Sequence, residues 1–325
     1  MCADATILRM VTAKELMDRI TAEMAKAIVG QEEVLTHLVV AVLTRGHVLM
    51  EGVPGIAKTL MGRVLARTLD AGFTRIQFTP DLMPSDVIGT TLYDPNKAEF
   101  RLKKGPIFTE ILLADEINRT PPKTQAALLE AMEERRVSIE GVEHQLAPLF
   151  TVLATQNPIE YEGTYPLPEA QLDRFTFKLL VGYPDKYEEL ELLKRYHAGF
   201  KSQDLDAAGI RKVVTLEDIT SARAGIQAVK VEGSVLEYVG EIARASREED
   251  DLLLGASPRA AIAMLLTSKT LAACRGRDFV IPDDVQEVAY PTLRHRLLLR
   301  PEAEIEGVRP DEVIGRLLGR IAVPR

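Results

Sequence analysis

The stretch Gly52-Val53-Pro54-Gly55-Ile56-Ala57-Lys58-Thr59 decides the fold of this chain. An apolar, strand-like segment, His47–Met50, precedes it, and a helical pattern that begins with Leu60 follows it. A strand, a glycine-rich turn and a helix that starts at Lys-Thr are the elements with which a backbone wraps a triphosphate. The amides of such a loop and the N-terminus of its helix face phosphate oxygens. The stretch therefore predicts a site for the phosphates of a nucleotide.

Three residues at the end of this loop have separate predicted roles. Lys58 reaches the β- and γ-phosphates, and Thr59 holds Mg²⁺ through its hydroxyl. Ala57 departs from the usual pattern, which has glycine at that position. We expect the alanine to be tolerated only if the backbone needs no positive φ there, because a side chain disfavours that conformation.

Length and composition are those of an ordinary globular protein with two domains. The chain has 325 residues, of which 46% are hydrophobic and 27% are charged, and its formal net charge of −8 argues against an open nucleic-acid surface. The two cysteines, Cys2 and Cys274, cannot build a disulfide framework or a zinc site, so we expect a cytoplasmic protein. The first ten residues lack the order of a signal peptide, and Arg45 interrupts the longest apolar run. We therefore expect no membrane insertion.

Strand-like and helix-like segments alternate through the first part of the chain, as a parallel α/β sheet requires. The expected strands are His47–Met50, Phe73–Phe78, Ile111–Ala114, Phe150–Thr155 and Phe175–Val181. The expected helices are Ala13–Ala27, Glu32–Thr44, Thr59–Leu69 and Pro122–Arg136. We therefore predict an α/β fold with a doubly wound sheet of five parallel strands. Ligands of such a sheet bind beyond the carboxyl ends of the strands.

After Asp185 the strand signals fade and helical patterns follow. Tyr187–Tyr196 predicts a helix, and Phe200–Gly209 is a polar stretch that could link two domains. Ser257 is a good N-cap for a helix with Pro258 at its first position. The further amphipathic runs are Leu216–Val229, Ser234–Ser246, Pro258–Ala273 and Pro282–Tyr290. We predict an α/β domain over residues 1–198 and a smaller all-helical domain over residues 207–325.

Polar side chains follow two of the expected strands. Asp115 and Glu116 end an apolar strand, whose successive side chains point to opposite faces, so the two acids can do different work. Asp115 is placed to order Mg²⁺, as in P-loop NTPases, and Glu116 is placed to activate the attacking water. A solvated acidic strand end is the alternative. Asn157 ends another strand, where its amide can bind both water and the γ-phosphate, although an Asn-Pro turn gives the same pattern.

These motifs together resemble the MoxR family of AAA+ ATPases. That family has the same alanine before the phosphate-binding lysine. The other matching segments are Gly105–Gln125, Ala154–Pro158, Leu167–Phe175 and Gly255–Ala260. The resemblance covers nearly the whole chain, and it implies an AAA+ domain with a helical lid that binds ATP with Mg²⁺ and hydrolyses it.

The resemblance also assigns roles to single residues. Asn157 matches the first sensor, Arg174 the arginine finger that reaches into a neighbouring subunit, and Arg259 the second sensor on the lid. Ile28 and Val29 match the stretch that lines the adenine pocket, where a plain contact between helices remains an alternative. A guanidinium neutralises charge on the transferred phosphoryl group, so both arginines suit hydrolysis. The residues implied to contact the nucleotide are Ile28, Val29, Gly52, Val53, Pro54, Gly55, Ile56, Ala57, Lys58, Thr59 and Leu60.

Two segments predict hairpins inside the α/β domain. Thr91–Leu102, with a turn at Asp94-Pro95-Asn96, reads as a hairpin that interrupts a helix, and Arg136–Leu146 turns near Gly141. Both resemble the pore-side loops of the AAA+ branch that also holds magnesium-chelatase subunits and replicative helicases. A helicase needs cations at such tips to track phosphates, whereas the second tip, Glu140–His144, is acidic. Nucleic acid is therefore disfavoured as the substrate.

The resemblance implies a homo-oligomeric ring, which we expect to be a hexamer. Its ATP hydrolysis would drive chaperone-like remodelling, maturation or activation of protein clients, often with a partner that has a von Willebrand factor A domain. A nucleic-acid motor of the helicase type is one alternative. A nucleotide-gated scaffold that does not hydrolyse ATP is another, which the complete set of catalytic residues disfavours.

Overall fold

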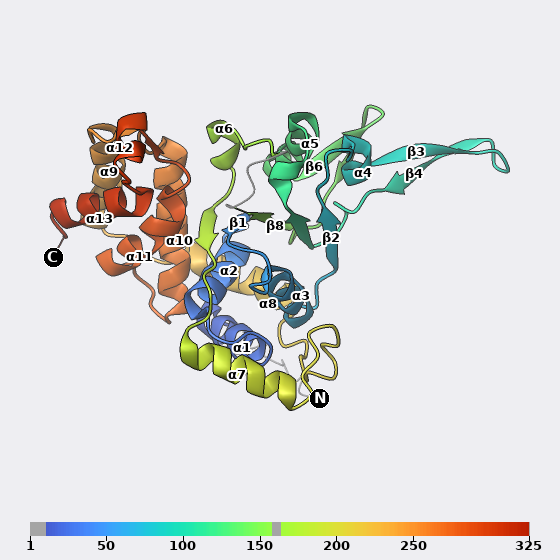
Figure 1. Cartoon of the computed structure of the whole chain (residues 1–325), viewed down its shortest axis with the longest axis horizontal. Coiled ribbons are helices and arrows are strands. Elements are labelled where there is room, and N and C mark those ends of the chain that lie inside the picture. Colours follow the sequence, from blue (N-terminus) through green and yellow to red (C-terminus); the bar gives the residue numbers. More distant parts are fainter. Residues whose placement is uncertain (1–10, 158–163, 325) are drawn as a thin grey trace, which may run out of the picture.

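The computed structural model describes residues 11–157 and 164–324 (Figure 1). Its central element is a five-stranded sheet with the order β2-β5-β8-β1-β9, in which every neighbouring pair is parallel. The strands are β1 (Val48–Glu51), β2 (Phe73–Gln77), β5 (Ile111–Asp115), β8 (Thr151–Gln156) and β9 (Phe177–Leu180). The predicted α/β fold and its five strands are confirmed, with strand ends within two residues of the expected ones.

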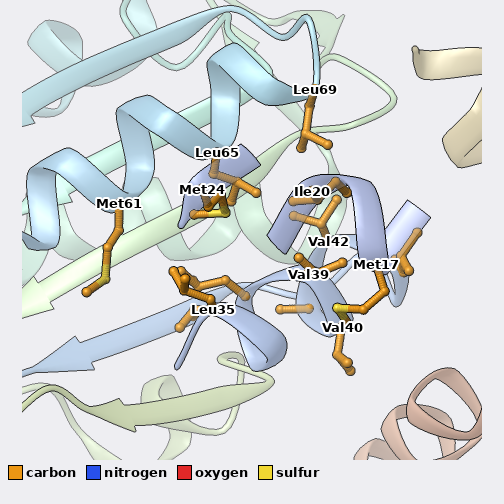
Figure 2. Packing of buried hydrophobic residues seen from close by; sticks show 14 of the residues in the cluster. Met17, Ile20, Met24, Leu35, Val39, Val40, Val42, Met61, Leu65 and Leu69 are labelled. Carbon is orange, nitrogen blue, oxygen red and sulfur yellow. The ribbon is translucent and has the colours of Figure 1, made fainter. Parts of the chain in front are cut away.

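Helices such as α1 (Ala13–Met24), α2 (Glu32–Leu43), α3 (Lys58–Thr68) and α5 (Pro122–Glu134) cover the two faces of this sheet. They can do so because the central strands β1, β5 and β8 are apolar on both sides. In β5, Ile111 and Leu113 pack in one core cluster with α1, α2 and α3, whereas Leu112 and Ala114 pack in another with α5. Figure 2 shows the first cluster, where Ile20 of α1 lies among side chains of α2 and α3. The helical elements of this domain are α1 (Ala13–Met24), α2 (Glu32–Leu43), α3 (Lys58–Thr68), α4 (Pro84–Ile88), the 3₁₀ turn η1 (Ile117–Arg119), α5 (Pro122–Glu134), α6 (Glu169–Leu172) and α7 (Lys186–His197).

Both expected hairpins are present as antiparallel pairs. They consist of β3 (Gly89–Asp94) with β4 (Glu99–Lys104), and of β6 (Arg136–Ile139) with β7 (Val142–Gln145). The first extends away from the body of the domain (Figure 1). The expectation that it interrupts a helix is wrong: α4 ends directly before it, and turns lead from it to β5. Gly105-Pro106 follows β4, and the residue before a proline disfavours helical backbone.

The lid lies beside the α/β domain (Figure 1) and is mainly helical, as predicted. Its elements are α8 (Leu216–Gln227), α9 (Gly233–Arg247), β10 (Leu252–Leu254), α10 (Pro258–Cys274), α11 (Pro282–Leu293), β11 (Leu298–Leu299), α12 (Pro301–Ile305) and α13 (Pro310–Arg320). The sequence patterns reveal α8 to α11 but not the β10–β11 pair, because runs of two and three residues show no period. Ser257 caps α10 as expected, since its hydroxyl accepts a hydrogen bond from the Ala260 amide at 3.2 Å.

The two parts of the chain share a packed boundary. Ile219 and Ala222 of α8 are buried in the same cluster as α1 and α2, and α10 also contacts both of these helices. Buried side chains of α9 and α13 form a separate core together with most of those of α10 and α11. The division of the chain at residue 207 stays a prediction. Within residues 11–157 and 164–324, every helix is too short or too polar to span a lipid bilayer.

Candidate active site

The glycine-rich loop connects β1 to α3 at the carboxyl edge of the sheet. Gly55 has φ of 86°, a conformation that favours glycine and turns successive amides towards one side. Gly52 is needed for another reason: a Cβ built on it would clash with the carbonyl oxygen of Val181 and the side chain of Ile56. Gly52 therefore lets the loop lie close to the end of β9, and Gly55 provides the turn of the backbone.

Ala57 contradicts the expectation that we drew for it. It adopts φ of 63° and ψ of 17°, the left-handed conformation that the alanine was expected to avoid. This conformation costs an alanine about 1 kcal/mol or more relative to glycine. The carbonyl oxygen of Ala57 accepts the first helical hydrogen bond of α3, from the Met61 amide at 2.9 Å. The shape of the loop thus comes from the buried elements β1 and α3, which impose the strained conformation.

One pocket brings the loop and the polar strand ends together. Its lining includes Lys58, Thr59, Asp115, Glu116 and Asn157. Asn157 is buried, with 6% of its surface exposed. Motifs that lie far apart in the sequence thus form one site because parallel strands end at the same edge of the sheet. The neighbouring Pro158 lies outside the described residues.

Lys58 lies among oxygen atoms. Its Nζ donates to the carbonyl oxygen of Gly52 at 2.5 Å and lies 3.5 Å from that of Gln156. Burial lowers the pKa of the Lys58 ammonium, and the charges of Asp115 and Glu116 act in the opposite direction. An ammonium in this position can bind the oxygen atoms of a phosphate held by the loop.

Asp115, the last residue of β5, has both carboxylate oxygens engaged. Its Oδ1 accepts a hydrogen bond from the hydroxyl of Thr155 at 2.6 Å. Its Oδ2 accepts two from Arg75, from Nε at 2.9 Å and from Nη2 at 2.6 Å. Sequence reasoning missed Thr155 and Arg75. Only the order of the sheet identifies them, since they lie on β8 and β2, the two neighbours of β5.

Glu116 does not follow the expected alternation along a strand, because β5 ends at Asp115. It lies beyond β5 in left-handed backbone, with φ of 57°, at the start of η1. Its Oε2 accepts a hydrogen bond from Gln77 Nε2 at 2.6 Å and lies 3.2 Å from Arg119 Nε. Its amide donates to the Thr155 hydroxyl at 2.8 Å. Gln77, also missed from sequence, thus holds the carboxylate expected to activate water.

The donor set of this pocket suits Mg²⁺. Thr59 and Asp115 offer a hydroxyl and a carboxylate oxygen, the ligand type that Mg²⁺ prefers. In the part of the chain that the structure describes, no group of three His, Cys, Asp or Glu side chains could hold a metal ion alone. Mg²⁺ takes one or two protein oxygens together with phosphate and water, which is what Thr59 and Asp115 would supply. Arg75 would share the Asp115 carboxylate with such an ion.

The expected adenine stretch lies next to α7, because the side chain of Glu188 approaches Gly30 closely. Ile28 is buried in the core cluster of α1, α2 and α3, and Gln31 Nε2 donates to the carbonyl oxygen of Gly182 at 3.2 Å. The described residues that line the phosphate pocket do not include Ile28 and Val29, nor Gly52, Val53 and Ile56 of the loop. The contact between Ile28, Val29 and adenine stays a prediction. The packing against α7 fits the alternative of a plain contact between helices.

Arg174 and Arg259 line a second pocket, together with Glu133 and Arg296. Arg259 Nη2 donates to Oε1 of Glu133 on α5 at 2.7 Å, and its side chain is 49% exposed. The described lining of this arginine pocket includes no residue of the glycine-rich loop. The two arginines thus line one pocket, and the phosphate pocket of their own chain is lined by other residues.

Comparison with known proteins agrees with the geometry. Residues 47–177 match the family described as "ATPase family associated with various cellular activities (AAA)", and residues 244–317 match "AAA lid domain". The chain is 42% identical to Chaperone MoxR1 of Mycobacterium tuberculosis, over 95% of this chain and 82% of that one. It is 46% identical to the uncharacterized protein YeaC of Bacillus subtilis, over 95% of both chains. It is 32% identical to Protein MoxR of Methylorubrum extorquens, over 88% of this chain and 89% of that one.

A solved structure has the same fold. The structure of a candidate ATPase from Cytophaga hutchinsonii matches with a TM-score of 0.88 and 43% identity, over 96% of both chains. The loop, the acids after β5 and these similarities identify a nucleotide-binding ATPase with an AAA+ domain and a helical lid. The chain belongs to the MoxR family of AAA+ ATPases.

Proposed function

We propose that this protein is a Mg²⁺-dependent ATPase whose active sites lie between the protomers of a ring, expected to be a hexamer. Membership of the family supports ATP hydrolysis and a chaperone-like role. The observation that carries the proposal is the shared pocket of Arg174 and Arg259, away from the phosphate loop of their own chain. Guanidinium groups at this position can stabilise the transferred phosphoryl group only if that group is bound to a neighbouring protomer.

The residues of the phosphate pocket have distinct roles in this reaction. The loop amides and Lys58 bind the phosphates, Glu116 accepts the proton of the attacking water, and Asn157 hydrogen-bonds water and the γ-phosphate. Thr59 and Asp115 would hold Mg²⁺, which neutralises charge on the phosphates when bound. The hydrogen bond from Gln77 keeps the Glu116 carboxylate engaged until substrate arrives.

A neighbouring protomer supplies the missing positive charge. A head-to-tail contact places different faces of two copies together and closes into a ring if the rotation allows it. Arg174 and Arg259 of one copy would then face the phosphate pocket of the next. An arginine in this position accelerates phosphoryl transfer on the order of 10³–10⁵-fold in related NTPases.

The surface of α7 supports assembly from copies of this chain. This helix has no fully buried side chain, and its apolar residues Tyr187, Leu190 and Leu193 are at least half exposed. Tyr196, at the end of the same helix, lines the phosphate pocket. A protomer that delivers arginines to this pocket would therefore lie next to α7 and could cover it. Exposed apolar patches of this kind mark interaction sites.

The client is proposed to be a protein, with a von Willebrand factor A domain partner, on the strength of the family resemblance. The tip of the β6–β7 hairpin carries Glu140 and Glu143, which disfavours a nucleic-acid track. A cytoplasmic location is part of the proposal, which the free thiol of Cys274 supports. Capture of proteins by the Glu116→Gln variant held in ATP would identify clients. Strong, salt-sensitive stimulation of phosphate release by DNA or RNA would favour the helicase alternative.

The decisive test separates nucleotide binding from turnover. Arg174→Ala should bind ATP normally and lose almost all phosphate release. Mixing it with Glu116→Gln should restore activity, because the first variant keeps an intact phosphate pocket and the second keeps its arginines. Arg244→Ala on α9, an exposed arginine paired with Glu241, is the matched control and should remain active. If mixing restores nothing, the sites are not shared between protomers.

A further inference from the structure

Asp173 joins the segment of the expected arginine finger to the lid. Its Oδ1 accepts a hydrogen bond from Nε of Arg296 at 2.6 Å, and its Oδ2 accepts one from the hydroxyl of Ser257 at 3.2 Å. Asp173 directly precedes Arg174, and Ser257 caps α10 two residues before Arg259. One carboxylate thus connects the backbone next to both arginines.

Arg296 extends this connection along the chain on both sides of Arg174. Its Nη2 donates to the carbonyl oxygens of Asp173 and Phe175, at 2.9 and 2.6 Å. Its Nη1 donates to that of Thr176 at 3.1 Å. The side chain of Arg296 is 3% exposed. A planar, buried guanidinium with this many fixed partners sets the direction in which the Arg174 side chain leaves the backbone.

The two residues before Arg296 bind the same segment and the strand β9 that follows it. Arg294 Nη1 donates to the carbonyl oxygen of Lys178 at 3.1 Å. His295 Nε2 lies 2.9 Å from the carbonyl oxygen of Phe175, and burial lowers the pKa of His295 well below its usual range. The neutral ring therefore donates from Nε2. Three successive lid residues thus fasten the lid to the start of β9.

The energetics of this junction favour a role in geometry. A buried ion pair such as Arg296–Asp173 loses hydration that its attraction only partly repays, and apolar side chains of similar volume stabilise a boundary at least as well. Directional hydrogen bonds, in contrast, fix distance and angle between the elements that they join. At this boundary the directional hydrogen bonds lie next to the backbone of Arg174 and Arg259.

We propose that Asp173 and Arg296 are positioning residues that hold Arg174 and Arg259 as one rigid unit, so that both enter the nucleotide site of the neighbouring protomer together. This inference rests on the proposed function, since it requires arginines that act between protomers. It adds that the lid and the finger segment move as one body during turnover. It also means that a substitution in the lid alone should alter the position of Arg174.

The test uses the full-length protein with Asp173→Asn, which keeps the shape of the side chain and removes its charge. Displacement of a catalytic group by about 1 Å costs about 100-fold in rate, so we expect a loss of this order in kcat. Binding of ATP by the same protomer should stay unchanged. Mixing Asp173→Asn with Glu116→Gln should restore turnover, whereas mixing it with Arg174→Ala should not, because both would then lack the arginine side of the site.

A matched control comes from another buried ion pair of the lid. Asp284 is fully buried and accepts hydrogen bonds from both Nη atoms of Arg277, at 2.6 and 2.5 Å. Asp284→Asn should lower the melting temperature. It should not cause a loss of kcat that mixing with Glu116→Gln restores. Arg296→Lys is a second variant for the junction. The ammonium keeps a charge near Asp173, but its three N–H donors lie on one nitrogen and cannot reach the Asp173 carboxylate and the three carbonyl oxygens together, so kcat should again fall and be repaired by mixing.

The outcomes separate the two proposals. If Arg174→Ala is repaired by Glu116→Gln but Asp173→Asn and Arg296→Lys are not, the shared site stands and the positioning role is overturned. Full activity of both junction variants also overturns it. If Arg174→Ala itself is not repaired, the proposed function fails first. Melting temperatures show which variants fold. If Asp173→Asn does not fold, the result with Arg296→Lys decides whether the junction positions the arginines.

Discussion

Arg75 donates two hydrogen bonds to Oδ2 of Asp115, from Nε at 2.9 Å and from Nη2 at 2.6 Å. The arginine comes from β2, two residues before Gln77, which binds Glu116. The positively charged guanidinium of Arg75 therefore binds the same carboxylate that we propose as a ligand of Mg²⁺. The arginine and the metal ion should compete for it.

Replacing this arginine should make the metal bind more easily. Arg75→Gln should lower the Mg²⁺ concentration at half-maximal phosphate release about two- to fivefold, because a half-exposed ion pair contributes at most about 1 kcal/mol. The control is Arg101→Gln on β4, an equally exposed arginine paired with Asp94, which should leave the Mg²⁺ requirement unchanged. An Mg²⁺ requirement that does not fall in Arg75→Gln would show that the two cations do not compete.

The strained backbone at Ala57 predicts a stabilising substitution. Ala57→Gly should raise the free energy of unfolding by about 0.5–1 kcal/mol, because the left-handed conformation costs alanine about 1–2 kcal/mol and the flexibility of unfolded glycine returns part of that. Urea unfolding measures the change. Gly225→Ala, inside α8 with open space around its Cβ position, tests the reverse exchange and should stabilise by about 0.5–1 kcal/mol. Destabilisation by Ala57→Gly would contradict the left-handed loop.

His47 predicts how stability depends on pH. The ring accepts a hydrogen bond from the Val152 amide at 2.9 Å, and its other nitrogen lies 3.2 Å from the carbonyl oxygen of Met132. Burial, and then the charge of Arg135, lowers the pKa of His47 to about 3 from its ordinary 6.5. Below pH 6.5 the unfolded chain thus binds a proton that the folded chain does not, so stability falls as pH falls.

The size of this effect can be measured by urea unfolding at several pH values. Between pH 7.5 and pH 5 the lowered pKa of His47 should cost about 2 kcal/mol. Burial also lowers the pKa of His37, to about 4, which should add a similar loss. His47→Gln should be less stable at pH 7.5 but should lose less on acidification. Equal pH dependence of the variant and the original protein would exclude His47 as a cause.

The exposed face of α7 predicts a variant that binds nucleotide but does not assemble. A charge at Leu193, which is 63% exposed, would have to be buried against a neighbouring copy, so Leu193→Asp should weaken assembly about tenfold or more. Sedimentation with ATP present should show protomers that still bind the nucleotide and hydrolyse it poorly. Ile305→Asp on α12, at a position that is 86% exposed, is the control and should assemble normally. Normal assembly of Leu193→Asp would place the interface elsewhere.

The sequence by itself determined the local parts of this protein. The strand, loop and helix around Lys58, the acids after β5 and the N-cap of α10 depend on neighbours a few residues apart, so their patterns are visible in the chain. The double burial of the parallel strands is likewise visible as continuous apolar runs such as Ile111–Ala114. These features are enough for the fold class and for the edge of the sheet where a nucleotide binds.

Only the tertiary structure decided which side chains surround those parts. Arg75 and Thr155 reach Asp115 because β2 and β8 lie on either side of β5, an order that no local period encodes. The meeting of Arg174 with Arg259 depends on the packing of the lid against the start of β9. Strand order and domain packing arise from contacts between residues far apart in the chain, and such contacts leave no regular spacing in the sequence.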